Sequence, residues 1–335
     1  MTWTHAYTDA TQVKWNGILG DMYIKAVEKI RVESLQLYPD AASRTVKAVV
    51  SVYNSSSQTV PVNLSLQVKG KDDGKSYASV ETQAEAVKGY STVELTCQLE
   101  DNAPLWDEFN PYLYDASVEL VSGKSISLTT ETFGLRDIRH EGNKLVMNEK
   151  PIFLRGTLEC CIFPLTGTPP TDEASWEKLY ASAREYGMNH LRFHSWCPPE
   201  AAFNVADEMG FYVQVELPVW SVTLGKDSAT VEFLRAEAKR ISKEYGNHPS
   251  FCFWSIGNEL QYDFNILASM LGEMKLQTTA IYIPPLPLHS KKVTATGRKT
   301  RMISSSLSGP RKDGYVDREY SIRNCRHSIK ISGHP

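Results

Sequence analysis

The feature that most constrains the fold is an apolar run over residues 251–256, which stops at Gly257 and is followed at once by Asn258 and Glu259. A short run of this kind is typical of a strand that is buried on both faces of a parallel sheet. In a TIM barrel the carboxyl ends of such strands meet on one rim, where active sites are built. The run therefore predicts a barrel strand that delivers an amide and a carboxylate to that rim.

The residues before this strand alternate between strand-like and helix-like patterns. We expect strands at residues 152–155, 188–194 and 211–216, and helices at residues 171–186, 199–209 and 228–245. Thr171 or Asp172 can cap the first helix, and Gly210 can end the second. Alternation of this kind indicates a parallel sheet with helices over its faces. We therefore assign residues 136–275 to the first half of a (β/α)8 barrel.

Residues 31–135 follow a different pattern, which is typical of an all-β domain. Alternating or β-branched runs lie at residues 32–38, 46–53, 60–68, 92–98, 113–120 and 126–132. Clusters of Asn, Ser, Gly and Asp separate these runs and favour turns. Short strands at this spacing predict an immunoglobulin-like β-sandwich. Residues 1–30 are too few for a domain, and we expect one strand-like piece at residues 21–27.

Composition excludes several classes of partner and site. The formal net charge of −3 argues against a nucleic-acid-binding surface as the main function. No apolar run is long enough to span a membrane, so we expect neither nucleic acid nor membrane as a partner. The six cysteines have no paired spacing of the kind that marks a zinc site or a disulfide framework. We therefore expect no metal and no cofactor.

The last part of the chain, residues 276–335, differs in composition from everything before it. It carries 11 Lys and Arg residues against three acids, and it is rich in Pro and Ser. One interpretation is a disordered basic tail. The other is a shift of reading frame near Lys275, because the helix–strand rhythm stops at about Leu276.

A set of short motifs spread along the chain points to one known family. They are residues 15–18, 105–106, 110–114, 133–136, 153–156, 207–210, 248–250 and 257–259. Taken together they resemble glycoside hydrolase family 2, which includes β-galactosidases, β-glucuronidases and β-mannosidases. The resemblance covers residues 15–274. It implies that residues 1–30 are the remnant of an N-terminal jelly-roll sugar-binding domain.

The resemblance also implies an activity and a site. The implied activity is that of a retaining exo-β-glycosidase, β-galactosidase-like, which hydrolyses terminal β-linked sugars. Glu259 resembles the general acid/base, and Asn258 resembles the amide that contacts the sugar 2-hydroxyl. Arg192 resembles a rim arginine, and Glu216 falls where some members hold a structural or metal-binding carboxylate. The start of the chain lacks a signal-peptide pattern, although a periplasmic or secreted location would suit a polysaccharide-degrading role.

Three more residues are candidates because they follow strand ends. His194 closes the second strand, and Trp196 and Trp220 lie just beyond the second and third strands. The two indoles could offer apolar platforms to a sugar ring, and His194 could contact the sugar. The alternative for His194 is an ordinary hydrogen-bonding residue. For Arg192 the alternative is a structural partner of Glu259 or Glu216.

A second carboxylate is missing from the expected site. Retaining glycosidases use two carboxyl groups about 5–5.5 Å apart, one as acid and one as nucleophile. Only Glu273 and Glu319 follow Glu259, and neither matches the family's nucleophile. The alternative function is therefore a catalytically inactive fragment that binds carbohydrate weakly and could self-associate through the open edge of a half-barrel. On that hypothesis the chain hydrolyses aryl β-glycosides no faster than its E259Q variant.

Overall fold

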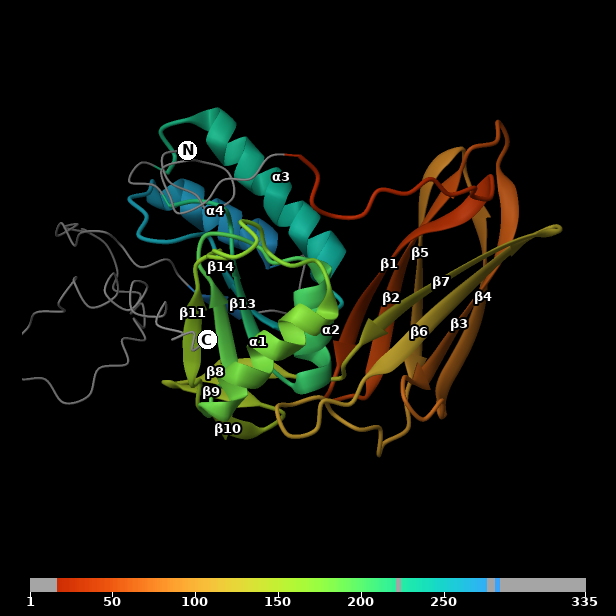
Figure 1. Cartoon of the computed structure of the whole chain (residues 1–335). Helices are drawn as coiled ribbons and strands as arrows, with labels where there is room; N and C mark the ends of the chain where they lie inside the picture. Colours follow the sequence, from red (N-terminus) through yellow and green to blue (C-terminus); the bar gives the residue numbers. More distant parts are fainter. Residues whose placement is uncertain (1–16, 221–223, 276–280, 284–335) are drawn as a thin grey trace, which may run out of the picture.

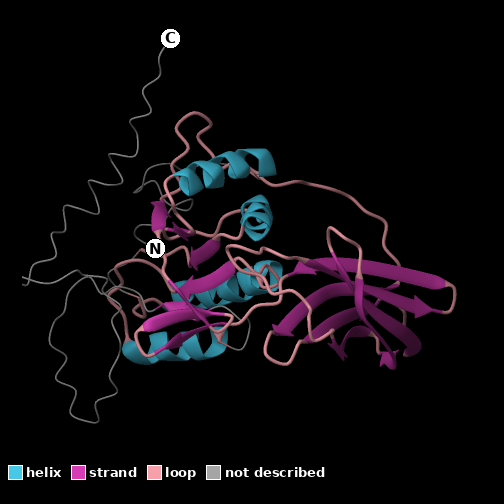
Figure 2. Ribbon diagram, turned by 90° about the horizontal axis from the view of Figure 1, so that it is seen from below, coloured by secondary structure: helices cyan, strands magenta, loops and turns pink. Residues whose placement is uncertain are grey.

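The computed structural model describes residues 17–220, 224–275 and the strand at residues 281–283. Figure 1 shows two units side by side, an all-β unit and an α/β unit, and Figure 2 shows the same division from below. Residues 1–16 and 284–335, which include most of the basic segment, lie outside the described residues, as do residues 276–280. Within the described part, no helix is both long and apolar enough to cross a lipid bilayer.

The all-β unit is a sandwich of two antiparallel sheets. One sheet has the order β1 (Ile30–Asp40), β2 (Thr45–Asn54), β5 (Gly89–Gln98), and the other has the order β4 (Ser76–Ala86), β3 (Val60–Gly70), β6 (Tyr114–Ser122), β7 (Ser125–Phe133). In β2 every second side chain is buried, from Val46 to Val52, as expected for a strand with one face on the core. Buried side chains of both sheets form a single core. The expected sandwich is confirmed.

Two details of the sandwich differ from the sequence prediction. Strand β4 was not expected, because its Ala, Glu and Gln residues have low strand propensity. It is an edge strand, and its outward Glu81, Gln83 and Glu85 are exposed, as is usual at a protected sheet edge. The strand expected at residues 21–27 is wrong. None of the described strands pairs with this segment, and Tyr23 and Ile24 are fully or largely exposed.

A small antiparallel sheet joins the sandwich to the α/β unit. It contains β8 (Ile138–Glu141), β9 (Lys144–Met147) and β10 (Lys150–Ile152). Asn148 and Glu149 make the tight turn between β9 and β10, and both have positive φ. Ile152 therefore pairs with Leu145 in this sheet, and the expectation of a first barrel strand at residues 152–155 is wrong. The first parallel strand is β11 (Gly156–Glu159).

The α/β unit is an incomplete TIM barrel. Its sheet has five parallel strands in the order β11, β12 (His190–Phe193), β13 (Tyr212–Glu216), β14 (Phe251–Ser255), β15 (Ile281–Ile283). The helices are α1 (Glu173–Glu185), α2 (Glu200–Met209), α3 (Ser228–Tyr245) and α4 (Phe264–Met274). Strand β15 corrects the expectation that the rhythm stops at Leu276, because it pairs with β14 beyond that point.

The helix boundaries follow from local capping. The Asp172 carboxylate accepts from Ser175 N at 2.9 Å and caps α1, so Asp172 rather than Thr171 is the cap. Asp227 and Asp263 cap α3 and α4 in the same way. Gly210 ends α2 with φ 69°, a conformation that glycine adopts without strain.

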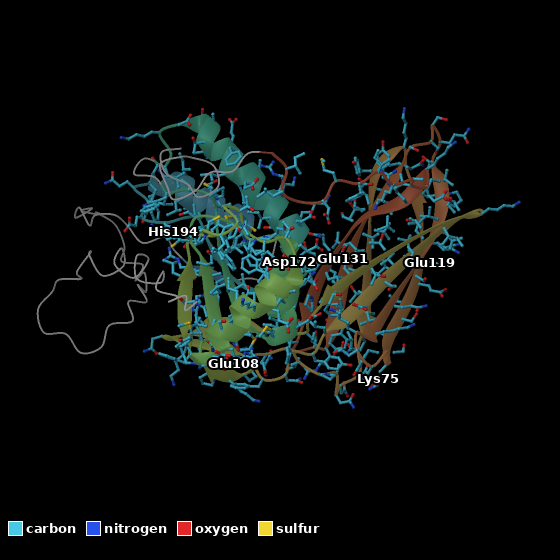
Figure 3. The ribbon with its side chains drawn as sticks, in the orientation of Figure 1. Lys75, Glu108, Glu119, Glu131, Asp172 and His194 are labelled. Atoms are coloured by element: carbon cyan, nitrogen blue, oxygen red, sulfur yellow. The ribbon has the colours of Figure 1, made fainter. Side chains whose placement is uncertain are left out.

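Buried polar contacts fix the sandwich against the foot of the barrel. The indole of Trp106 donates to Asp207 O at 2.8 Å. The buried Arg136 guanidinium donates to Pro249 O at 2.5 Å and to Phe251 O at 2.9 Å. Asn247 bonds both to β1 and to Glu131, which lies at the boundary between the two units (Figure 3). An apolar cluster that includes Trp106, Ile138, Met147, Tyr212 and Phe253 fills the space between these parts.

Candidate active site

The candidate residues converge on the carboxyl ends of the parallel strands. Figure 3 places His194, which follows β12, at this end of the sheet, whereas Glu108 lies at the opposite, lower end of the α/β unit. The ends of β12, β13 and β14 carry Arg192, Glu216 and the Asn258–Glu259 pair, respectively. These side chains are far apart in sequence, and the parallel register of the sheet brings them together.

Arg192 connects the three strands through two short hydrogen bonds. Its Nε donates to Glu216 Oε1 at 2.6 Å, and its Nη2 donates to Asn258 Oδ1 at 2.8 Å. A guanidinium presents several donors in a fixed plane, so these two bonds set the orientation of the Asn258 amide. Because Oδ1 is engaged, the Asn258 amide can offer its Nδ2 group as the donor to a further partner.

Glu216 is a buried carboxylate with several donors around it. Its side chain is only 1% exposed. Besides Arg192, Ser195 N donates to Oε2 at 2.8 Å and Gln214 Nε2 donates to Oε1 at 3.3 Å. In the described part of the chain, no group of three His, Cys, Asp or Glu side chains could hold a metal ion. The geometry supports the structural alternative for Glu216 over the metal-binding one.

The Asn258–Glu259 pair is held by a close approach of two rim loops. Gly257 has φ 147°, and a Cβ at this position would lie 2.3 Å from Val219 O. Asn258 N donates to the same Val219 carbonyl at 3.1 Å. Glu259 itself has φ 46°, in the left-handed region that few non-glycine residues adopt. Strained backbone of this kind is common at functional sites.

The Glu259 carboxylate accepts a hydrogen bond from the indole of Trp220. Trp220 Nε1 donates to Glu259 Oε2 at 3.0 Å. The ring of His194 lies edge to face with that of Trp220, with the centroids 5.0 Å apart. Burial lowers the pKa of His194 to about 3, and the positive charge of Arg192 acts in the same direction. His194 is therefore neutral at ordinary pH and adds no charge beside Glu259.

Trp196 does not lie with the other candidates. Its side chain is 3% exposed and belongs to the core between the sheet and the helices. Its ring packs against Phe193 and Phe163, with centroids 5.4 and 6.3 Å away. The residue follows the strand end, but Ser195 turns the chain back with φ 58°. The structure therefore gives no support to Trp196 as a platform for a sugar.

The structure adds one rim carboxylate that sequence reasoning missed. Glu159 ends β11, and its Oε2 and Oε1 accept from Cys161 N at 2.9 Å and from Ile162 N at 3.3 Å. Burial raises the pKa of Glu159 to about 7, against the opposing effect of these two N–H donors. The signal was present, since Glu159 ends its strand as Glu216 does. The misplaced first strand concealed it.

Two family models match this chain. The model described as glycosyl hydrolases family 2 matches residues 30–136, and the one described as glycosyl hydrolases family 2, TIM barrel domain, matches residues 138–279. The chain belongs to glycosyl hydrolase family 2. The resemblance noted in the sequence is confirmed, and so is the fold class expected from the strand and helix patterns.

This family-2 chain matches part of each of its curated relatives. It is 24% identical over 274 residues to the β-galactosidase of Oenococcus oeni, and the matched region covers 77% of this chain and 26% of that protein. It is 24% identical over 290 residues to the β-galactosidase large subunit of Latilactobacillus sakei, which covers 78% of this chain and 43% of that subunit. The chain thus spans less than half the length of either relative.

Solved structures of the family have the same fold. A family-2 member from Bacteroides cellulosilyticus superposes with a TM-score of 0.68 at 21% identity and covers 77% of this chain and 35% of that one. A β-glucuronidase from Parabacteroides merdae gives a TM-score of 0.65 at 20% identity, with 76% and 33% covered. At these identities the likeness establishes a sandwich followed by part of a TIM barrel.

Proposed function

We propose that this chain carries the acid/base half of a retaining β-glycosidase site that acts on terminal β-linked sugars, β-galactosides first among them. The observation that carries the proposal is the placement of Glu259 at the carboxyl end of β14, beside Asn258 and within 3.0 Å of the Trp220 indole. Relatives named β-galactosidase and β-glucuronidase support a carbohydrate substrate. A galactoside is favoured because several of the matching relatives carry the β-galactosidase name.

The proposed chemistry assigns one role to each rim residue. Glu259 gives its proton to the glycosidic oxygen as the bond from that oxygen to the anomeric carbon breaks. Asn258 donates from Nδ2 to the sugar 2-hydroxyl, because its Oδ1 is held by Arg192. Arg192 and Glu216 act as the support that keeps this amide in place. His194, neutral and buried, packs beside Trp220.

A second candidate function rests on the other carboxylates of the rim. Within the described residues, Glu216 accepts from Arg192, Ser195 and Gln214, and Glu159 accepts from two backbone N–H groups. Neither resembles the nucleophile that a retaining mechanism needs about 5–5.5 Å from the acid. This observation favours a chain that binds a sugar weakly and does not hydrolyse it alone.

An external nucleophile separates the two candidates. With aryl β-galactosides, we expect the wild-type chain alone to be no faster than E259Q. Added azide can attack the anomeric carbon from the opposite face while Glu259 protonates the leaving phenol oxygen, so the products are an α-glycosyl azide and a phenol. We expect azide to raise phenol release in the wild type and in E273Q, and to leave E259Q unchanged.

The outcomes are distinct. Equal azide-dependent rates in wild type and E259Q would contradict the acid role of Glu259. If the wild type turns over substrate without azide and E259Q does not, the sugar-binding function without hydrolysis is excluded and the glycosidase function is supported. No turnover under either condition, together with galactose binding that is lost in N258A, would support the sugar-binding alternative. A parallel series with aryl β-glucuronides tests the choice of sugar.

A further inference from the structure

Two loops on the rim run beside each other beyond the end of the sheet. They are residues 217–220, which follow β13, and residues 256–262, which follow β14, and we call them the paired rim loops. Asn258 N donates to Val219 O at 3.1 Å, and Trp220 forms a parallel bridge with Asn258. Further along, Leu224 N donates to Gln261 O at 2.8 Å. The backbone of Trp220 is therefore fixed relative to that of Glu259.

We propose that Trp220 is a positioning residue for the Glu259 carboxylate and not a stacking platform for the sugar. This inference rests on the proposed acid role of Glu259. The indole Nε1 is a donor only, and it lies 3.0 Å from Oε2. An oxygen that accepts from the indole is disfavoured as the site of the proton, so the proton of the acid resides on Oε1.

The surroundings of the ring suit this role. The two loops approach so closely at Gly257 that a Cβ added there would lie 2.3 Å from Val219 O. This close approach brings Trp220 near Glu259. His194 packs edge to face against the indole at 5.0 Å and is itself 8% exposed. The backbone bridge and the ring contact together restrict the indole. A general acid gains rate when its proton is held toward the leaving oxygen.

The hydrogen bond can be tested without any turnover. In wild-type protein labelled with 15N-tryptophan, the indole N–H resonance of Trp220 should differ in position from the same resonance in E259Q, because the substitution exchanges the carboxylate acceptor for an amide. The indole of Trp254, which has no acceptor among the described residues, serves as the internal control. The Trp220 resonance is assigned as the indole signal that disappears in W220F. If W220F does not fold, the signal is assigned in the wild type from correlations between the indole and the Trp220 backbone.

The positioning role has its own kinetic signature, read from azide-dependent phenol release. W220F keeps an aromatic face but loses the donor. Its kcat/KM should fall by about 10- to 100-fold for a phenol that needs protonation to leave, and by about threefold or less for a highly activated phenol. W196F, a matched change in the core, should not distinguish the two leaving groups. Loss of a stacking platform would instead lower both rates equally.

Each result decides a different point. A Trp220 indole that ignores the E259Q change, or a W220F defect that is equal for both phenols, overturns the positioning role. An indole that responds to the E259Q change in a protein without azide-dependent turnover overturns the proposed glycosidase function and leaves the Trp220–Glu259 contact established.

Discussion

Glu216 holds Arg192 through a 2.6 Å hydrogen bond between Oε1 and Nε, and the pair joins the ends of β12 and β13. The second arm of Arg192 reaches Asn258 at the end of β14, so one guanidinium ties three neighbouring strands together. The carboxylate of Glu216 is almost completely buried, whereas the arginine is partly exposed. The Glu216–Arg192 pair therefore holds the Asn258 amide in place, and Asn258 is the residue that contacts a ligand in the proposed site.

Removing the charge of Glu216 should destabilise the protein. In E216Q the partly exposed Arg192 guanidinium loses its ionic partner, so we expect a loss of up to about 3 kcal/mol, the lower end of the cost of breaking a buried pair. Urea denaturation followed by tryptophan fluorescence measures this loss. E94Q is the matched control, because Glu94 pairs with Lys47 on the exposed face of the sandwich and such a pair contributes about 1 kcal/mol or less. Equal losses in the two variants would contradict the role given to Glu216.

Alanine substitutions at two glycines should have opposite effects. G257A places a Cβ 2.3 Å from Val219 O at φ 147°, so we expect a loss of about 2 kcal/mol or more in unfolding free energy. Gly272 lies within α4, and nothing lies within 4 Å of its added Cβ. G272A should therefore stabilise the protein by up to about 1 kcal/mol. Thermal denaturation of both variants is sufficient, and a stable G257A would contradict the close approach of the paired rim loops.

The His248–Asp207 contact should make stability depend on pH. Burial opposes the charged form of His248, but the Asp207 carboxylate, 2.6 Å from Nδ1, outweighs it and leaves the pKa raised above 6.5. A raised histidine pKa gives stabilisation that is fully present below the unfolded value and is lost as pH rises through the folded value. The unfolding free energies of wild type and D207N should therefore differ more at about pH 5.5 than at about pH 8.5. A pH-independent difference would contradict this assignment.

Glu159 should also make the unfolding free energy fall as the pH rises, as His248 does. Its pKa is raised by burial to about 7 from an ordinary value of 4.5, so folding favours the protonated form. This contribution is present below about pH 4.5 and is lost as the pH rises to about 7. E159Q should remove that part of the slope and leave the His248 part intact. The measurement is a urea series between about pH 5 and pH 8 on wild type, E159Q and the double variant with D207N.

The elements with strong local signals were predictable. The capped helices α1 and α3 and the alternating strand β2 appear close to where the sequence places them. Edge strand β4 was missed because its Ala and Glu residues have low strand propensity. The first barrel strand was misplaced because residues 152–155 are more apolar than β11, and only the turn at Asn148 and Glu149 assigns Ile152 to a hairpin.

Some residues of the candidate site were likewise predictable from the sequence, and others were not. The Asn258–Glu259 pair and Arg192 are visible in sequence because they end strands, and the parallel register brings such ends together. The direction of the side chain after a strand end is not visible in sequence. Ser195 adopts a positive φ and turns Trp196 into the core, while the pairing of the rim loops turns Trp220 toward Glu259. Both tryptophans follow their strands at a similar distance, and only tertiary contacts separate them.

Arg136 has a consequence for how the chain can be divided. It is the last residue of the segment matched as the sandwich, yet its guanidinium donates to Pro249 O and Phe251 O at the start of β14. A protein cut at the domain boundary would lose the Arg136 donor to these two carbonyls, at the start of the strand that leads to Asn258 and Glu259. The smallest unit that can be expressed with its acid correctly placed therefore includes the sandwich, whatever sugar the rim binds.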